Sequence, residues 1–117
     1  MHERTLLGRR GEGAAATFYE RNGYRVLDRN YRCAAGELDL VVGRSRTVVF
    51  CEVKTRATDH FGTPAEAVSL QKQARLRRLA AAWLACRRPK AVEIRFDVVS
   101  VIVRDGRLHL THIPDAF

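Results

Sequence analysis

The chain has 117 residues, which is enough to bury one hydrophobic core but short for two, so we expect a single domain over residues 1–117. A composition that is 46% hydrophobic and 29% charged excludes an intrinsically disordered protein. Lysine and arginine outnumber aspartate and glutamate 21 to 13, and the resulting formal charge of +8 favours a polyanionic partner without identifying one.

The N-terminal third predicts a helix followed by a strand. Small and apolar residues recur at helical spacing from about residue 7 to residue 22, and Asn22-Gly23 supplies a stop signal. Residues 24–31 are typical of a strand, and the polar group Asp28, Arg29 and Asn30 indicates a position near the edge of a sheet.

A β-hairpin is predicted next. Apolar residues alternate over residues 38–42, and a second apolar run covers residues 47–53. If the turn is centred on Arg44-Ser45, Asp39 lies diagonally across from Glu52 on the neighbouring strand.

The strongest helical pattern lies in the third quarter of the chain and ends before Pro89. Its apolar stripe consists of Leu76, Leu79, Ala80, Trp83 and Leu84. Thr63-Pro64-Ala65-Glu66 has the form of a helix start, with a capping hydroxyl and a proline at the first helical position. Ser69 offers a second start.

The C-terminal part predicts two strands joined by a tight turn. Residues 92–99 alternate in polarity, and Asp105-Gly106 is a strong hairpin signal before residues 108–113. The predicted order is therefore α, three strands, α, two strands. The long helix between the third and fourth strands is a crossover that allows parallel strands to join one sheet, which indicates an α/β fold.

The cysteines and the apolar runs bear on the compartment. Cys33, Cys51 and Cys86 lack the paired spacing of a zinc or redox motif, which favours free thiols in a reducing environment. The first ten residues lack the apolar stretch of a signal peptide, and no later run is long enough to cross a bilayer. We therefore expect a cytoplasmic protein with no membrane partner.

Three residues of the hairpin suggest chemistry. Glu52 and Lys54 are two apart on a predicted strand, so both project from one face, and Asp39 can close the diagonal gap to Glu52 around a cation. Two carboxylates and an ammonium suit Mg²⁺-dependent phosphodiester hydrolysis. Glu-x-Lys alone is more often a solvated face or a surface ion pair, and Asp39 on the adjoining strand favours the catalytic interpretation.

Several motifs resemble those of the YraN-like family of small bacterial proteins. They are Gly11-Glu12, Asn30-Tyr31-Arg32, Gly36-Glu37-Leu38-Asp39-Leu40, Phe50-Cys51-Glu52-Val53-Lys54-Thr55-Arg56, Phe61-Gly62-Thr63-Pro64 and Arg95-Phe96-Asp97. The resemblance covers nearly the whole chain. It implies a PD-(D/E)XK nuclease fold of the restriction-endonuclease and Holliday-junction-resolvase type, an αβββαβ core with a mixed central sheet flanked by helices, to which this chain adds a C-terminal hairpin strand.

The resemblance also implies roles for individual residues. Asp39 and Glu52 are expected to bind Mg²⁺ or Mn²⁺ with the backbone carbonyl of Val53, Lys54 is the expected catalytic lysine, and Glu12 resembles the first-helix glutamate that completes such sites. The chain departs from the family pattern at two positions, with leucine at 38 where isoleucine is usual and cysteine at 51 where valine is usual. Neither departure alters the metal site.

Other polar residues have weaker signals. Lys72, Arg75 and Arg56 are candidate nucleic-acid contacts, although Lys72 fits a snorkelling lysine somewhat better and Arg75 belongs with Arg77 and Arg78 on a face that is first of all solvated. Asp97 fits an internal ion pair with Arg95 or Arg56, and Glu37 is either exposed or a support for the site. The four histidines show no metal-ligand spacing. Trp83 and Phe96 are most simply core residues.

The leading hypothesis is a Mg²⁺- or Mn²⁺-dependent endonuclease-like enzyme acting on DNA, with branched DNA suggested by the fold analogy alone. One alternative is a nucleic-acid-binding module that keeps the nuclease fold but does not cleave. Another is a nuclease directed at RNA, because phosphate chemistry and basic charge serve both polymers.

Overall fold

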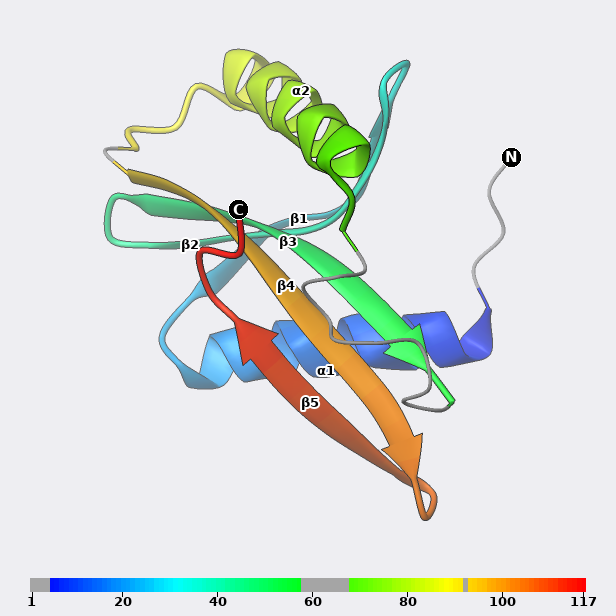
Figure 1. Cartoon of the computed structure of the whole chain (residues 1–117). Coiled ribbons are helices and arrows are strands. Elements are labelled where there is room, and N and C mark those ends of the chain that lie inside the picture. The colour runs from blue at the N-terminus through cyan, green and yellow to red at the C-terminus, as the bar shows by residue number, and fades with distance from the viewer. Residues whose placement is uncertain (1–4, 58–67, 92) are drawn as a thin grey trace.

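The computed structural model describes residues 5–57, 68–91 and 93–117. Its elements follow in the order α1 (Leu6–Arg21), β1 (Arg25–Cys33), β2 (Gly36–Arg44), β3 (Thr47–Arg56), α2 (Leu70–Arg87), β4 (Glu93–Arg104) and β5 (Arg107–Ile113) (Figure 1). The predicted order of a helix, three strands, a helix and two strands is confirmed.

The five strands form one mixed sheet in the order β1-β2-β3-β4-β5. Strands β3 and β4 run parallel, and every other neighbouring pair is antiparallel. The parallel pair requires a long connection, and α2 belongs to that connection, as predicted. β1 lies at one edge of the sheet, which agrees with the polar residues in its sequence.

One helix covers each face of the sheet (Figure 1). On the α2 side, the predicted stripe packs against apolar residues of β2, β3 and β4, and Leu76, Leu79, Ala80 and Trp83 are buried. On the α1 side, Ala15, Ala16 and Tyr19 pack against the opposite face of the same strands. Burial on both faces explains why consecutive residues are buried in β3 (48–52) and in β4 (96–101), and the α/β fold is confirmed.

Local hydrogen bonds fix the helix ends. The Thr5 hydroxyl oxygen accepts a 2.9 Å hydrogen bond from the Gly8 amide and caps α1. The Ser69 hydroxyl accepts from the Lys72 amide at 3.2 Å, so the second of the two predicted starts begins α2. The other predicted start, at residues 63–66, lies outside the described residues. α2 ends at Arg87, and Arg88 adopts a left-handed conformation before Pro89.

The turn between β2 and β3 corrects one prediction. It is formed by Ser45 and Arg46, not by Arg44 and Ser45, because Arg44 pairs with Thr47 as the last rung of the ladder. Ser45 takes the left-handed conformation that such a turn needs, at φ 54°, without a glycine to mark the position in the sequence. The register therefore differs by two residues from the predicted one, which leaves every side chain on its predicted face of β3.

Two aspartates, Asp97 on β4 and the half-buried Asp28 on β1, anchor the helices to the sheet. Asp97 is fully buried and accepts hydrogen bonds from Tyr19 of α1 at 2.7 Å and from Arg95 at 2.8 Å, which agrees with its predicted ion pair. Asp28 accepts from the Trp83 indole at 3.0 Å and from Arg87 at 2.8 Å. These contacts fix α1 on β4 and α2 on β1. Across the described residues, no helix is long and apolar enough to span a membrane.

Candidate metal centre

The side chains of β2 stop alternating at Asp39. Leu40 packs into the core on the α1 side, whereas Val41 and Leu38 both pack on the α2 side. Strict alternation would place Leu38 on the same side as Leu40. On the neighbouring strand Asn30, between the paired positions of Leu40 and Leu38, adopts a left-handed φ of 54°. The sheet is therefore distorted around Asp39, which borders a cavity on each side.

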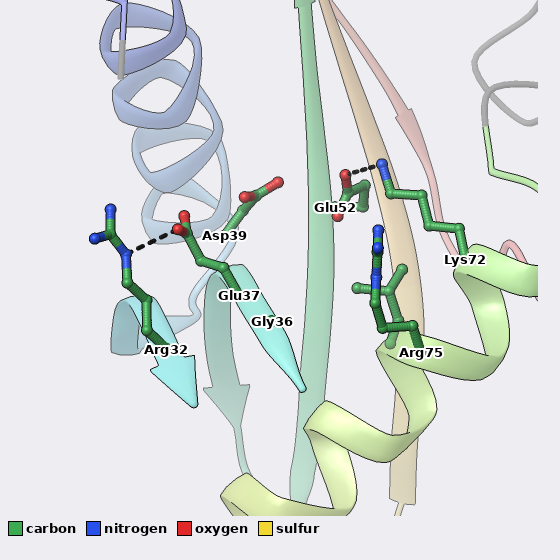
Figure 2. Close-up of a pocket in the computed structure, with 8 residues that line it drawn as sticks. Arg32, Gly36, Glu37, Asp39, Glu52, Lys72 and Arg75 are labelled. Atoms are coloured by element: carbon green, nitrogen blue, oxygen red, sulfur yellow. Dashed lines mark hydrogen bonds and ion pairs between the residues drawn. The ribbon is translucent and has the colours of Figure 1, made fainter. Parts of the chain in front are cut away.

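The first of these, which we call the α2-side cavity, has a volume of about 450 Å³ and lies between β2, β3 and the first turns of α2 (Figure 2). Its lining residues are Arg32, Gly36, Glu37, Asp39, Glu52, Lys72, Arg75 and Leu76. Asp39 and Glu52 thus border the same space, as do two of the three candidate nucleic-acid contacts. Arg56, the third, is the last residue of β3 and does not line this cavity.

Glu52 is buried and meets two ammonium groups. Its Oε1 atom lies 2.7 Å from Nζ of Lys72 and 3.3 Å from Nζ of Lys54. Burial, together with the neighbouring Lys72 ammonium, lowers the pKa of Lys54 below its usual range. Burial acts in the same direction on Lys72, but the Glu52 carboxylate outweighs it and the pKa of Lys72 is raised. Lys54 is therefore the easier of the two lysines to deprotonate.

Asp39 is oriented by the backbone of β3. Its Oδ2 atom accepts a 2.9 Å hydrogen bond from the amide of Val53. The paired register of β2 and β3 runs from the turn to Leu40 opposite Cys51, and Asp39 comes directly beyond this last pair. Beyond the last pair, the Asp39 side chain takes the place of a backbone carbonyl as the hydrogen-bond acceptor for the Val53 amide. Val53, whose carbonyl is an expected ligand, is the residue that holds Asp39 in place.

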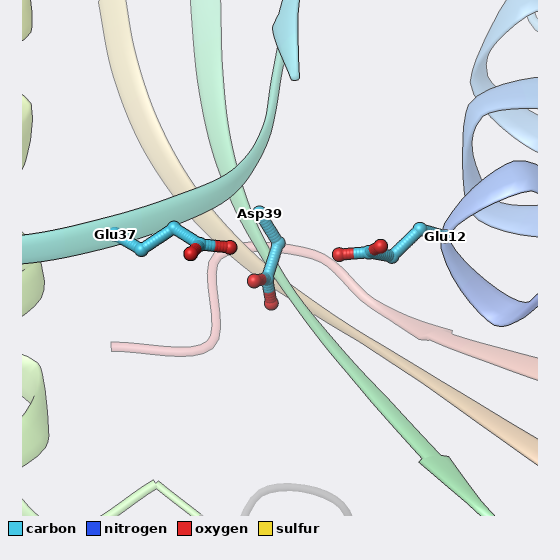
Figure 3. A group of neighbouring side chains, drawn as sticks. All are labelled: Glu12, Glu37 and Asp39. Carbon is cyan, nitrogen blue, oxygen red and sulfur yellow. The ribbon is translucent and has the colours of Figure 1, made fainter. Parts of the chain in front are cut away.

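Three carboxylates converge beside this point. One oxygen each from Glu12 of α1 and from Glu37 and Asp39 of β2 lie within 4.8 Å of one another (Figure 3). Glu12 reaches the group because α1 lies very close to β3 at Gly11, where a Cβ atom would approach the Thr55 hydroxyl to 1.9 Å. The distorted sheet and the close helix together produce a cluster of negative charge.

This cluster fits a divalent cation. Carboxylate oxygens are the ligands that Mg²⁺ and Mn²⁺ prefer, and three of them lie close enough to share one ion. A fourth oxygen is near: Oδ1 of Asn30 is buried and has no hydrogen-bond partner among the described residues. Asn30 borders the same cavity as Glu12 and Asp39. Glu52 is not a member of this cluster, since its carboxylate pairs with the two lysines.

The second cavity bordered by Asp39, the α1-side cavity, is smaller, at about 150 Å³. It is lined by Arg9, Glu12, Gly13, Arg29, Asn30, Asp39 and Leu40. Asp39 is therefore the residue that the two cavities share. Cations line both of them, Arg32, Lys72 and Arg75 on the α2 side and Arg9 and Arg29 on the α1 side.

Some site features were missed or misassigned from the sequence. Glu37 was interpreted as an exposed or supporting residue, yet it belongs to the carboxylate cluster and is held by Arg32 at 2.9 Å. Its two-residue spacing from Asp39 is a signal that could have identified it. Arg77 is exposed, as predicted for a solvated helix face, and its guanidinium also lies over the ring of Phe96 at 4.9 Å and near Phe117. Arg9, Arg29 and Asn30 come together beside Asp39 only in the folded chain, and no sequence pattern indicated this.

Comparison with known proteins identifies relatives along the whole chain. The model of the uncharacterised protein family UPF0102 matches residues 11–101. A UPF0102 protein of Geobacter metallireducens is 42% identical over 117 residues, covering 100% of this chain and 95% of its own. A UPF0102 protein of Frankia casuarinae is 48% identical over the full length of both chains, and one of a Mycobacterium species (strain KMS) is 49% identical over 94% of this chain and 84% of its own.

Proposed function

The chain belongs to the uncharacterised protein family UPF0102, the YraN-like family, and we propose that it is a metal-dependent endonuclease-like protein that hydrolyses phosphodiester bonds in DNA. One observation carries the proposal. The carboxylate cluster of Glu12, Glu37 and Asp39 adjoins a cavity that Glu52 and Lys72 also line, and Glu52 is in turn in contact with Lys54, whose pKa is lowered. Metal ligands, a candidate base and phosphate-binding cations therefore meet at one place.

In this proposal Glu12, Glu37 and Asp39 hold Mg²⁺ or Mn²⁺, and Glu52 and the Val53 carbonyl are further ligands on the β3 side of Asp39. When bound, such a cation neutralises phosphate charge and lowers the pKa of water. The protein supplies the fixed positions. The Val53 amide orients Asp39, and Arg32 orients Glu37.

The two lysines around Glu52 take different roles. Lys54, with its lowered pKa, accepts a proton from the attacking water. Lys72, with its raised pKa, keeps its charge and binds a non-bridging phosphate oxygen. Arg75, one helical turn along the same helix, lines the same cavity and extends this positive surface. The separation of the two pKa values in one environment is the pattern expected of an acid–base site.

DNA is the proposed substrate, and its branched forms are included because of the resemblance to resolvase-like nucleases. A net charge of +8 favours either nucleic acid. Among the described residues, the α2-side cavity is lined by the cations Arg32, Lys72 and Arg75, by three carboxylates, and by Gly36 and Leu76. The contacts proposed for these cations are with backbone phosphates.

One observation favours a second function, a nucleic-acid-binding module without cleavage. Both lysine ammonium groups contact the same Glu52 oxygen, so the carboxylate is neutralised by protein cations. A binding module needs Lys72 and Arg75 but has no need for a free Glu52. The two functions differ in whether a divalent cation is required for turnover.

The test is cleavage by the purified full-length protein. Single-stranded, duplex and branched DNA and the matching RNAs are incubated with Mg²⁺, Mn²⁺ or chelator, and products are resolved on gels. We expect metal-dependent internal cleavage of DNA. Lys54→Ala should lower the rate by roughly 100-fold or more, because the water then lacks its base. Lys90→Ala, which removes an exposed lysine after α2, is the matched control and should leave the rate unchanged.

Two results would contradict the endonuclease proposal. The first is the absence of cleavage of every substrate with either metal, which would leave the binding module as the better account. The second is equal cleavage by wild type and Lys54→Ala, which would remove the proposed base. Cleavage of RNA in preference to DNA would redirect the activity to RNA.

A further inference from the structure

The arginines of the α1-side cavity are not used by the chemistry described so far, although Glu12 and Asp39 in its lining belong to the carboxylate cluster. It opens next to the carboxylate cluster but on the other side of Asp39 from Lys54 and Lys72. Two arginines from separate elements border it, Arg9 from the first half of α1 and Arg29 from β1. Two cations that border one small cavity next to the cluster are suited to bind an anion.

Both guanidinium groups are available for a ligand. Arg9 and Arg29 are exposed, and in the described portions of the chain neither side chain forms an ion pair. Arg32, Arg87 and Arg95, in contrast, are each held on a carboxylate at 2.8–2.9 Å. A planar guanidinium offers parallel N–H donors that match two oxygens of a phosphate group.

The size of the cavity suits a single phosphate group. Its volume of about 150 Å³ equals that of about five water molecules at roughly 30 Å³ each. Gly13 keeps one wall open, because a Cβ atom added there would meet no atom within 4 Å. Leu40 forms an apolar part of the lining, so the polar contacts come from the two arginines, Asn30 and the two carboxylates.

The charge of the cavity depends on the metal. Without a cation, the positive charges of Arg9 and Arg29 are offset by the carboxylates of Glu12 and Asp39. A divalent cation on those carboxylates leaves the cavity with a net positive charge. An anion should therefore bind there more strongly once the metal centre is filled.

We infer that the α1-side cavity is a subsite for the phosphate of the nucleic-acid backbone that neighbours the phosphate being cleaved. The inference rests on the proposed function, since that places the reacting phosphate on the α2 side of Asp39. Cations on both sides of the centre then hold the backbone before and after the reacting bond. This arrangement requires a strand that continues in both directions, and so selects internal bonds over strand ends.

The test measures binding without cleavage. Full-length Lys54→Ala protein is titrated into fluorescein-labelled DNA at several salt concentrations, once with Mn²⁺ and once with chelator. Adding Arg9→Gln or Arg29→Gln should each reduce the slope of log K against log salt by about 0.7–0.9, because each removes one phosphate contact. This reduction of the slope should be larger with Mn²⁺ than with chelator. Arg107→Gln, at an exposed position on the far strand β5, is the matched control and should keep the slope.

A double variant keeps the inference testable if the single arginine effects are small. Arg9→Gln/Arg29→Gln removes both proposed phosphate contacts and should lower the slope by about 1.4–1.8. Slopes and affinities of the Arg9 and Arg29 variants equal to those of Arg107→Gln would overturn the subsite, whether or not wild type cleaves DNA. If their slopes fall but wild type cleaves nothing, the subsite stands and the endonuclease proposal fails.

Discussion

Buried charges at single residues do two different tasks in this molecule. At Glu52 two lysines share one carboxylate oxygen, and in the proposed function these charges serve the reaction. At Asp97 they are arranged for stability, because the carboxylate is completely enclosed by donors from α1, β4, β5 and the C-terminal segment. The difference lies in access, as Glu52 borders a cavity and Asp97 is fully buried.

Asp97→Asn should destabilise the fold by about 3 kcal/mol, because it leaves the Arg95 guanidinium partly buried without its counter-charge. Burial raises the pKa of Asp97, but hydrogen bonds from Arg95 and His112 outweigh burial and lower the pKa overall. A lowered pKa means that this stabilisation is present above the unfolded value of about 3.9 and is lost as pH falls through the folded value. Urea denaturation of wild type and variant at several pH values measures both effects.

Asp105→Asn is the matched control for Asp97. It makes the same chemical change in an exposed turn. The backbone at this position is left-handed, and asparagine tolerates that conformation as aspartate does. Its unfolding free energy should stay within about 0.5 kcal/mol of wild type. If Asp97→Asn proves equally mild, or if its deficit relative to wild type is the same at acidic and neutral pH, the Asp97 network does not stabilise the fold as described.

Contacts between residues close together in the sequence were easier to predict than contacts between distant segments. The Arg95–Asp97 ion pair follows from two residues on one strand, and the common face of Glu52 and Lys54 follows from alternation. The membership of Glu37 in the cluster was missed, although its two-residue spacing from Asp39 gave the same kind of local signal. Contacts such as those of Lys72 with Glu52 join distant segments, and only the packing of α2 determines them.

At the scale of elements, α1 is adapted to lie unusually close to the sheet. Gly11 and Gly13 lie two residues apart on this helix and have opposite surroundings. A Cβ at position 11 would clash with Thr55 of β3, whereas a Cβ at position 13 would point into open space. The first glycine is needed for contact with the sheet, whereas the second borders open space, including the α1-side cavity.

This contrast gives a paired prediction for stability. Gly11→Ala should destabilise the fold by about 1–3 kcal/mol, because the added methyl group overpacks the contact between helix and sheet. Gly13→Ala should stabilise it by about 0.5–1 kcal/mol, since alanine favours the helix and meets no neighbour. Thermal or urea unfolding of the two variants measures both. Equal effects of the two substitutions would show that the close approach of α1 to β3 is not as described.

Element types were more predictable than element junctions. The apolar stripe of α2, the Asp105-Gly106 turn and the parallel placement of β3 and β4 follow from pattern and from connection length. The turn after β2 was displaced by one residue because no glycine marks it, and Ser45 adopts the left-handed conformation instead. Of two candidate starts for α2, local signals alone favoured neither, and the structure uses Ser69.

For the whole molecule, the arrangement of the sheet determines which residues meet at the carboxylate cluster. The two helices cover opposite faces, so α1 contributes Glu12 to one side of Asp39 and α2 contributes Lys72 to the other. The centre forms where β2 and β3 separate beyond Leu40 and Cys51, which gives both helices access to the same carboxylate. Neither a helix nor the hairpin alone contains the carboxylate cluster, because Glu12 comes from α1 and Glu37 and Asp39 come from β2.

The most direct measurement of the central claim is divalent-metal binding by the purified protein, followed by calorimetry or by the electron paramagnetic resonance of Mn²⁺. Asp39→Asn and Glu12→Gln should each weaken Mn²⁺ binding by more than about 100-fold, because each exchanges a charged oxygen ligand for a neutral amide. Glu20→Gln makes the same change at an exposed position on α1 and should bind as wild type does. Affinities that are equal across wild type, Asp39→Asn and Glu12→Gln would contradict the assignment of this cluster as a metal centre.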